Sequence, residues 1–201
     1  PKNVTCVKPS GTLSKIMDTT EGVHKPLGKY IFNNVQFSKY DPVVEKLREA
    51  NYKVFNHPTD DTGVLVTFPV EWSDVPFHKQ DGKEVNLETA VDQLERYKLI
   101  QTSWTQQNTS VTISYEPNEV DNIVDWLINN WDCYVGVSFI YRSDPTKTAK
   151  DLGYLYLPQE VVDEYTFRTY VQDLKPVNID QANSFDAILD DECLTGACPV
   201  K

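Results

Sequence analysis

The feature that most constrains the fold is a repeated alternation of two kinds of segment. Short runs rich in β-branched and aromatic residues indicate strands, and longer stretches with apolar residues at three-to-four spacing indicate helices. Because the two alternate, the sequence predicts an α/β fold with helices crossing over between strands. Strands are expected at 4–8, 30–37, 63–68, 110–115 and 134–141, and helices at 43–50, 86–107, 116–128 and 158–174.

Two of the expected helices carry recognisable start signals. Asp41 followed by Pro42 is typical of an N-cap and a first helical position, and it opens the helix at 43–50. Glu116 and Pro117 open another helix, whose apolar residues recur at helical spacing. Its predicted face consists of Val120, Ile123, Val124, Leu127 and Ile128.

The expected domain organisation is a domain over 1–174 followed by a tail over 175–201. With 201 residues, of which 40% are hydrophobic, the chain can build one large domain or part of one. It opens at Pro1 directly into a strand-like run, so we expect a C-terminal piece of a longer polypeptide. Residues 175–201 have poor periodicity and many acidic residues, which predicts a flexible C-terminal tail.

The charge and the apolar pattern exclude several classes of function. Thirty acidic residues against 19 basic ones give a formal net charge of -11, which repels phosphodiester backbones and disfavours nucleic-acid binding. A small phosphorylated ligand needs only a local site and is not excluded. No apolar run approaches the ~20 residues of a membrane helix, and no signal peptide opens the chain. The four cysteines form no secreted disulfide framework, which favours a reducing cytoplasm.

The first candidate site is the run KPSGTLS at 8–14, where a strand is expected to turn into a helix. A helix N-terminus carries a charge of about +0.5 and exposes unpaired N–H groups, so it attracts oxyanions. The amides of Gly11, Thr12 and Leu13 would point out of this helix start, and the hydroxyls of Ser10, Thr12 and Ser14 add donors. The spacing GxxxxGK of a Walker loop is absent. An ordinary Ser or Thr cap is the alternative.

The second candidate is a dithiol near the C-terminus, formed by Cys193 and Cys198. The small residues between them let the segment fold back, so the two sulfurs could reach disulfide distance. A dithiol on a flexible tail can enter a cleft, exchange with a disulfide there and leave to be reduced again. Two incidental cysteines and a zinc site are the alternatives. His24, His57 and His78 stand in no ligand spacing with the pair, so no metal site is predicted.

The third candidate is His24, in the run TEGVH at 20–24. Its imidazole could contact a ligand, and a histidine that is hydrogen-bonded within a turn is the alternative. Cys6 and Cys133 lie in or beside strand-like runs, and both are predicted to be small core residues.

Several of these runs together resemble one enzyme family, the adenosylcobalamin-dependent (class II) ribonucleotide reductases. The likeness is to their C-terminal half, and within the family the monomeric ribonucleoside-triphosphate reductases are most similar. It covers nearly the whole chain, and only the combination of runs is specific. The runs are CVKPSGTLS at 6–14, EGVH at 21–24, VQF at 35–37, QNTSVTI at 107–113 and the ending with Cys193 and Gly196-Ala197-Cys198-Pro199.

The resemblance implies an α/β fold that supplies the last strands of a ten-stranded α/β barrel, followed by the tail. In that family, cleavage of the Co–C bond of adenosylcobalamin leads to a thiyl radical on a barrel cysteine, which abstracts the ribose 3′ hydrogen. Two further barrel cysteines then reduce the 2′ carbon and become a disulfide. The function implied is thus reduction of ribonucleotides to 2′-deoxyribonucleotides, an oxidoreductase step of DNA precursor synthesis.

Carried over by position, the turn at Ser10, Gly11, Thr12, Leu13 and Ser14 would hold the substrate phosphates. The tail cysteines, Cys193 and Cys198, would re-reduce the barrel disulfide and be recharged by thioredoxin or a similar reductant.

The resemblance leaves the radical cysteine unmatched, since neither Cys6 nor Cys133 stands in the family's Asn-x-Cys-x-Glu pattern. We therefore expect this chain to be inactive without an N-terminal half that carries that cysteine. Its monomeric-type features favour triphosphate substrates. The alternative function is a non-catalytic redox-relay or regulatory module that interacts with thioredoxin.

Overall fold

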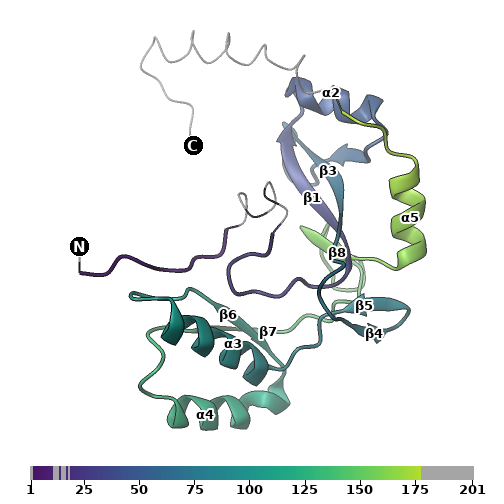
Figure 1. Cartoon of the computed structure of the whole chain (residues 1–201). Coiled ribbons are helices and arrows are strands. Elements are labelled where there is room, and N and C mark those ends of the chain that lie inside the picture. The colour runs from purple at the N-terminus through teal and green to yellow at the C-terminus, as the bar shows by residue number, and fades with distance from the viewer. Residues whose placement is uncertain (1, 11–13, 15–16, 18, 178–201) are drawn as a thin grey trace. The chain divides into compact units, whose positions relative to one another are not determined.

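The computed structural model describes residues 2–10, 14, 17 and 19–177. The chain divides into two compact units. Unit 1 consists of Pro1–Lys29 and Glu71–Lys147, and unit 2 consists of Tyr30–Val70 and Thr148–Lys201. Both contain helices and strands, which confirms the predicted α/β class (Figure 1).

Unit 2 is built on a four-stranded sheet in the order β2-β3-β1-β8. Its edge pairs are antiparallel: Val54 of β2 lies opposite Val66 of β3, and Ile31 of β1 opposite Val161 of β8. The centre of β3 is fully buried. The strands are β1 (Tyr30–Ser38), β2 (Val54–Asn56), β3 (Gly63–Glu71) and β8 (Gln159–Val161).

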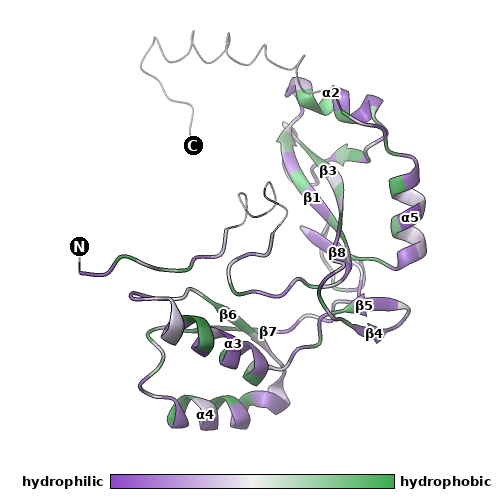
Figure 2. Ribbon diagram, viewed as in Figure 1, coloured by the Kyte–Doolittle hydropathy of each residue, from purple (hydrophilic) through white to green (hydrophobic). Residues whose placement is uncertain are grey.

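Two helices belong to unit 2, α2 (Pro42–Glu49) and α5 (Glu164–Gln172). Asp41 caps α2 by accepting a hydrogen bond from the Val43 N–H, which confirms the predicted start of this helix. α5 buries Phe167, whose ring lies 5.0 Å from that of Tyr30. Figure 2 shows hydrophobic and hydrophilic residues together on β1 and on α2, as expected for elements with one covered face.

Unit 1 combines a parallel strand pair, a hairpin and two helices. β6 and β7 pair in parallel with α4 between them in the chain, as the predicted crossover requires. A core of eight buried residues lies around α3 and α4 and includes Leu94, Tyr97 and Trp126. The elements are β4 (His78–Gln80), β5 (Lys83–Val85), α3 (Ala90–Ser103), β6 (Thr112–Tyr115), the 3-10 turn η1 (Pro117–Glu119), α4 (Val120–Asn129) and β7 (Ser138–Tyr141).

Several predicted elements differ from the structure, among them the strand predicted at 134–141, which begins at Ser138. The helix expected over 158–174 begins at Glu164, because Asp163 caps it and the preceding residues pair with β1 as β8. α3 begins at Ala90 rather than at residue 86, since the Thr89 hydroxyl accepts the Asp92 N–H as a cap. The strand expected at 4–8 is reduced to a single bridge at Val7.

The predicted face of α4 is only partly right. Ile123 is buried as expected, but Val124 and Ile128 are 47% and 67% exposed. The helix instead turns Trp126 inward, where its indole N–H donates to Glu95 of α3 at 2.6 Å. Packing against α3, which the spacing within α4 does not encode, selects which apolar residues are covered.

Candidate functional site

Three segments that lie far apart in the sequence come together in unit 1. They are residues 4–10, 21–24 and 104–113, and we call them the loop cluster. Val7 forms a parallel bridge with Thr109. Its N–H donates to the Asn108 carbonyl at 3.2 Å, and its own carbonyl accepts the Ser110 N–H at 2.8 Å. Three of the runs that carry the family resemblance, at 6–14, 21–24 and 107–113, thus meet in one place.

Further hydrogen bonds, made by the backbone and the side chain of Thr5, continue this contact toward the N-terminus. The Thr5 carbonyl accepts the N–H groups of Gln106 and Gln107 at 3.2 and 3.1 Å. The Thr5 hydroxyl donates to the Trp104 carbonyl at 2.8 Å. The segment is therefore held by individual bonds to the 104–110 loop rather than by a strand ladder.

Gly22 brings the 21–24 loop against the backbone at the start of the predicted turn. Its φ is +59°, a left-handed conformation that favours glycine. A Cβ at this position would lie 3.1 Å from the Lys8 carbonyl oxygen and 3.4 Å from the Pro9 nitrogen. Both the backbone conformation and the close approach to Lys8, which lies two residues before Ser10, therefore favour glycine.

His24 fastens the other end of this loop. Its Nδ1 lies 2.8 Å from the Glu21 carbonyl, and its Nε2 accepts the Thr112 N–H at 3.1 Å. Since a carbonyl only accepts and an amide only donates, these contacts use Nδ1 as the donor and Nε2 as the acceptor. His24 is therefore hydrogen-bonded within a turn, as the alternative to ligand binding expects. Contact between His24 and a ligand stays a prediction.

Two of the five residues predicted to bind phosphate are described, Ser10 and Ser14. The Ser14 N–H donates to the Ser10 hydroxyl oxygen at 3.3 Å, and the Ser14 hydroxyl donates to the Ser10 carbonyl. An N-cap side chain accepts from the amide two or three positions ahead, so this bond over four positions is a contact within the turn and not a standard N-cap. Ser14 is 4% exposed, so its hydroxyl serves the turn itself. Gly11, Thr12 and Leu13 lie outside the described residues.

The predicted tail dithiol, Cys193 and Cys198, also lies outside the described residues. Of the other two cysteines, Cys133 is half-buried and its thiol lies 2.9 Å from the Asn130 carbonyl. The prediction that Cys6 is a core residue is wrong, because it is exposed on a segment that forms no strand.

Asn108 lies in the loop cluster, but it is not among the candidate site residues that the sequence predicts. Among the described residues, its Oδ1 is the one buried side-chain oxygen or nitrogen without a hydrogen-bond partner. Buried polar atoms are nearly always paired, so such an atom marks a place where a further group is needed. The run QNTSVTI was one of those that resemble the reductase family, but nothing in the sequence distinguished Asn108 from its neighbours.

A tyrosine pair ends the parallel strands. Tyr115 of β6 and Tyr141 of β7 are register partners, and their ring centroids lie 4.9 Å apart. Hydrogen bonding to Tyr141, together with burial, raises the pKa of Tyr115 above its ordinary value.

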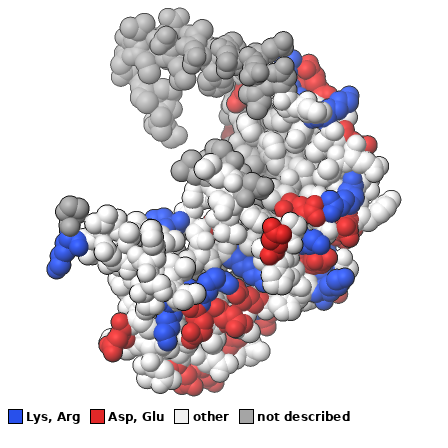
Figure 3. Space-filling model, viewed as in Figure 1, with Lys and Arg blue, Asp and Glu red and all other residues white. Residues whose placement is uncertain are grey.

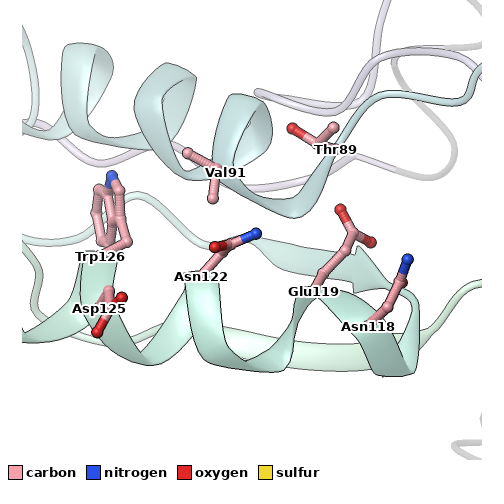
Figure 4. Close-up of a pocket in the computed structure, with 7 residues that line it drawn as sticks. All are labelled: Thr89, Val91, Asn118, Glu119, Asn122, Asp125 and Trp126. Carbon is pink, nitrogen blue, oxygen red and sulfur yellow. The ribbon is translucent and has the colours of Figure 1, made fainter.

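An open cavity of about 540 Å³ lies between α3 and α4 in unit 1 (Figure 4). Figure 4 shows Val91 of α3 pointing toward α4. Glu119 and Asp125 line the cavity, and acidic side chains gather over this part of unit 1 (Figure 3). Glu119 is already engaged, since it accepts the Ala90 N–H at 2.7 Å and pairs with Arg142 at 3.2 Å. The acidic lining disfavours an anionic ligand here.

A smaller cavity of about 410 Å³ lies in unit 2 beside the VQF run. Gln36 lines it and donates to the Asp60 carboxylate at 2.9 Å. Hydrogen bonds from the Thr62 hydroxyl and N–H hold the pKa of Asp60 below its ordinary value. Within the described ranges, no group of three or more His, Cys, Asp or Glu side chains could hold a metal ion.

Known proteins similar to the chain share one description. A probable adenosylcobalamin-dependent ribonucleoside-triphosphate reductase of Dictyostelium discoideum is 27% identical over 206 residues, which cover 100% of this chain and 26% of that protein. The adenosylcobalamin-dependent ribonucleoside-triphosphate reductases of Levilactobacillus brevis and Lactobacillus leichmannii are 27% and 26% identical over 98% of this chain and 26% of theirs. This chain is homologous to the adenosylcobalamin-dependent ribonucleoside-triphosphate reductases. It spans about a quarter of the length of these reductases.

The fold points the same way. A crystal structure of a B12-dependent (class II) ribonucleotide reductase matches 89% of this chain and 23% of its own, with a TM-score of 0.72 and 23% identity. No protein-family model matches the chain. Through the part of the chain that the structure covers, no helix combines the length and apolar character needed to cross a bilayer.

Proposed function

We propose that this chain is the C-terminal part of an adenosylcobalamin-dependent ribonucleoside-triphosphate reductase, which converts ribonucleotides to 2′-deoxyribonucleotides. The observation that carries this proposal is the loop cluster. Three of the runs that resemble the family, separated by up to about a hundred residues, meet there through specific bonds. A site assembled from distant segments on a rigid scaffold is a common arrangement for binding and catalysis.

In this proposal, the turn at 10–14 holds the substrate phosphates. Its helix start supplies N–H groups and serine or threonine hydroxyls to an oxyanion. The loop cluster keeps the entry of this turn in place through Gly22 and Val7. The net charge of -11 makes such a local donor site necessary, because the surface as a whole repels a polyphosphate.

Adenosylcobalamin, the cofactor named for the relatives, supplies an organic radical when bound. Neither of the two cavities described above fits it, because cavities of about 300–1,000 Å³ hold drug-sized ligands and a corrin with its nucleoside is far larger. We therefore propose that neither of these two cavities is the cofactor site.

The tail dithiol is the proposed reductant of the active site. A thiolate of Cys193 or Cys198 attacks the disulfide left by turnover, and the second thiol closes the exchange. The tail pair becomes a disulfide, the active-site pair becomes a dithiol, and thioredoxin or a similar reductant restores the tail. Such exchange requires a reducing compartment, so we place the protein in the cytoplasm.

A ten-stranded barrel, shared with an N-terminal part, is the proposed setting of β6 and β7. Parallel strands are normally covered on both faces, whereas here the side chains of Phe139, Ile140 and Tyr141 are 38%, 57% and 66% exposed. Strands and helices from the N-terminal part, which we propose carries the radical cysteine, would cover this surface. The division of the chain into 1–174 and a tail over 175–201 belongs to the same proposal.

The test is reconstitution with the N-terminal part, adenosylcobalamin, a ribonucleoside triphosphate and a reductant. We expect deoxynucleotide only when both parts are present. Gly11→Val should raise the Kd of the triphosphate, because a side chain blocks approach to the amides. Replacing Cys193 and Cys198 by Ser should stop turnover with thioredoxin and preserve it with a small dithiol. If no deoxynucleotide forms with wild-type parts, while thioredoxin still reduces the tail, the redox-relay function replaces this proposal.

A further inference from the structure

Arg96 of α3 reaches the loop cluster from outside it. Its Nε donates to the Val23 carbonyl at 2.8 Å. Its two terminal nitrogens bond both carboxylate oxygens of Glu88. The side chains of Arg96 and Glu88 are 32% and 12% exposed, so this is a largely covered, bidentate pair.

Glu88 is itself held by hydrogen bonds at both its backbone N–H and its backbone carbonyl. Its N–H donates to the Asn86 side-chain oxygen at 3.0 Å, and its carbonyl accepts from Arg142 at 2.7 Å. Arg142 lies at the end of β7 and also donates to the Ser114 carbonyl of β6 at 3.1 Å. The carboxylate that orients Arg96 is therefore tied to the parallel strand pair.

Val23 is the centre of a loop that is fastened at three points. Arg96 holds its carbonyl, His24 binds the Thr112 N–H, and Gly22 rests against the Lys8 carbonyl. Val23 itself is 8% exposed and belongs to the unit 1 core. A shift of the Val23 carbonyl would therefore move Gly22, and with it the backbone two residues before Ser10.

The desolvation of a largely covered ion pair offsets much of its attraction, so stability alone is a weak explanation for this arrangement. Two nitrogens of the Arg96 guanidinium donate to Glu88, and the third donates to the Val23 carbonyl. Lysine, with a single ammonium group, cannot reproduce this geometry. Binding groups need supporting contacts that hold them within about 0.5 Å of a productive geometry.

We propose that Arg96, oriented by Glu88, is a positioning residue that sets the entry of the anion-binding turn through the 21–24 loop. This rests on the proposed phosphate role of that turn. Arg96 touches no substrate in this proposal, and it acts by fixing where Gly22 meets Lys8 and Pro9.

The test measures the Kd of a ribonucleoside triphosphate by equilibrium dialysis with the assembled reductase, together with KM, kcat and the melting temperature. Arg96→Met should raise Kd and KM by about tenfold or more, because a displacement of about 1 Å caused by a remote substitution can cost up to about 100-fold. Arg96→Lys, which keeps the charge, and Glu88→Gln, which keeps a hydrogen-bonding partner, should fall between Arg96→Met and wild type. A matched control is Arg48→Met, which removes an exposed pair with Glu45 in unit 2 and should leave Kd unchanged.

Three outcomes separate this inference from the function on which it rests. A raised Kd for both Gly11→Val and Arg96→Met supports both. A raised Kd for Gly11→Val, with a lower melting temperature but unchanged Kd in all Arg96 and Glu88 variants, overturns the positioning role alone. An unchanged Kd for Gly11→Val removes the phosphate role of the turn, and this inference with it. Because Arg96→Lys and Glu88→Gln are conservative, they decide the question if Arg96→Met does not fold.

Discussion

The sheet of unit 2 and the loop cluster of unit 1 keep their backbones in place by different means. In the sheet, β1 and β3 are nine residues each and satisfy their polar groups through strand pairing, while Val64, Leu65 and Val66 are buried side by side. In the loop cluster, the backbone is irregular. Individual hydrogen bonds made by the side chains of Thr5, His24 and Arg96 hold it in place.

This difference predicts how substitutions in the two regions affect the protein. A sheet spreads its stability over many apolar contacts, so one substitution lowers the stability of the whole element. A loop held by a few directional contacts can shift when one of them is lost while the fold remains. We therefore expect sheet variants to change stability with little effect on ligand affinity, and loop-cluster variants to do the reverse.

The largest expected effect on stability is that of Leu65→Ala. Leu65 is 0% exposed in the buried first half of β3, so truncation leaves a cavity and should lower the free energy of unfolding by about 2–5 kcal/mol. Denaturant unfolding measures this loss. The Kd of the triphosphate for the folded assembly should stay at the wild-type value, and a large rise would show that the two regions are not separable.

A smaller effect on stability, but a larger one on affinity, is expected for Gly22→Ala. The comparison is with Gly82→Ala, since Gly82 also has a positive φ (+77°) but nothing within 4 Å of an added Cβ. Both variants carry the cost of a left-handed alanine, about 1–2 kcal/mol. Only Gly22→Ala pushes against the Lys8 carbonyl, so only this variant should also raise the Kd of the triphosphate. Equal Kd values for the two variants would contradict the role given to this contact.

The smallest expected effect is a pH-dependent one in unit 2. Hydrogen bonds from the Thr166 N–H and hydroxyl hold the pKa of Asp163 below its ordinary value. The carboxylate therefore contributes stability above the ordinary Asp pKa of about 3.9, and this contribution is lost as pH falls through the lowered pKa. Asp163→Ala should cost about 1 kcal/mol at neutral pH.

Unfolding measured from pH 7 down to pH 2 checks this prediction. The difference between wild type and Asp163→Ala should shrink as the pH falls. Asp163→Asn is the matched control, because asparagine caps a helix about as well but does not titrate. A difference that stays constant with pH would mean that the carboxylate charge has no part in the cap.

Local chemistry made much of the fold predictable. β1, β3 and α2 follow from a β-branched run or from the Asp41-Pro42 start signal. The hairpin of β4 and β5 was missed although its turn, Asp81-Gly82, is a favoured two-residue hairpin turn with positive φ at both positions. β8 could not be predicted in this way, because its three residues become a strand only by pairing with β1.

The candidate site was predictable as a set of short runs and not as an arrangement. The runs at 6–14, 21–24 and 107–113 were singled out in the sequence, and so were Ser10, Ser14 and His24 within or beside them. Arg96, Glu88 and Asn108 were not, because an arginine on a helix and an amide in a loop are ordinary residues until their partners are known. For Arg96, the significance lies in its contacts with Glu88 and Val23, which are 8 and 73 positions away in the sequence.

By itself, the sequence determined the α/β class, the start of α2 and the resemblance to a reductase family. These depend on backbone propensity, on side-chain spacing and on short identities, all of which are local. Only the tertiary structure decided that Gly22 meets Lys8, that His24 bonds Thr112 and that Arg96 supports the loop between them. Such contacts depend on where distant segments are brought by packing, and no local preference of the chain encodes that distance.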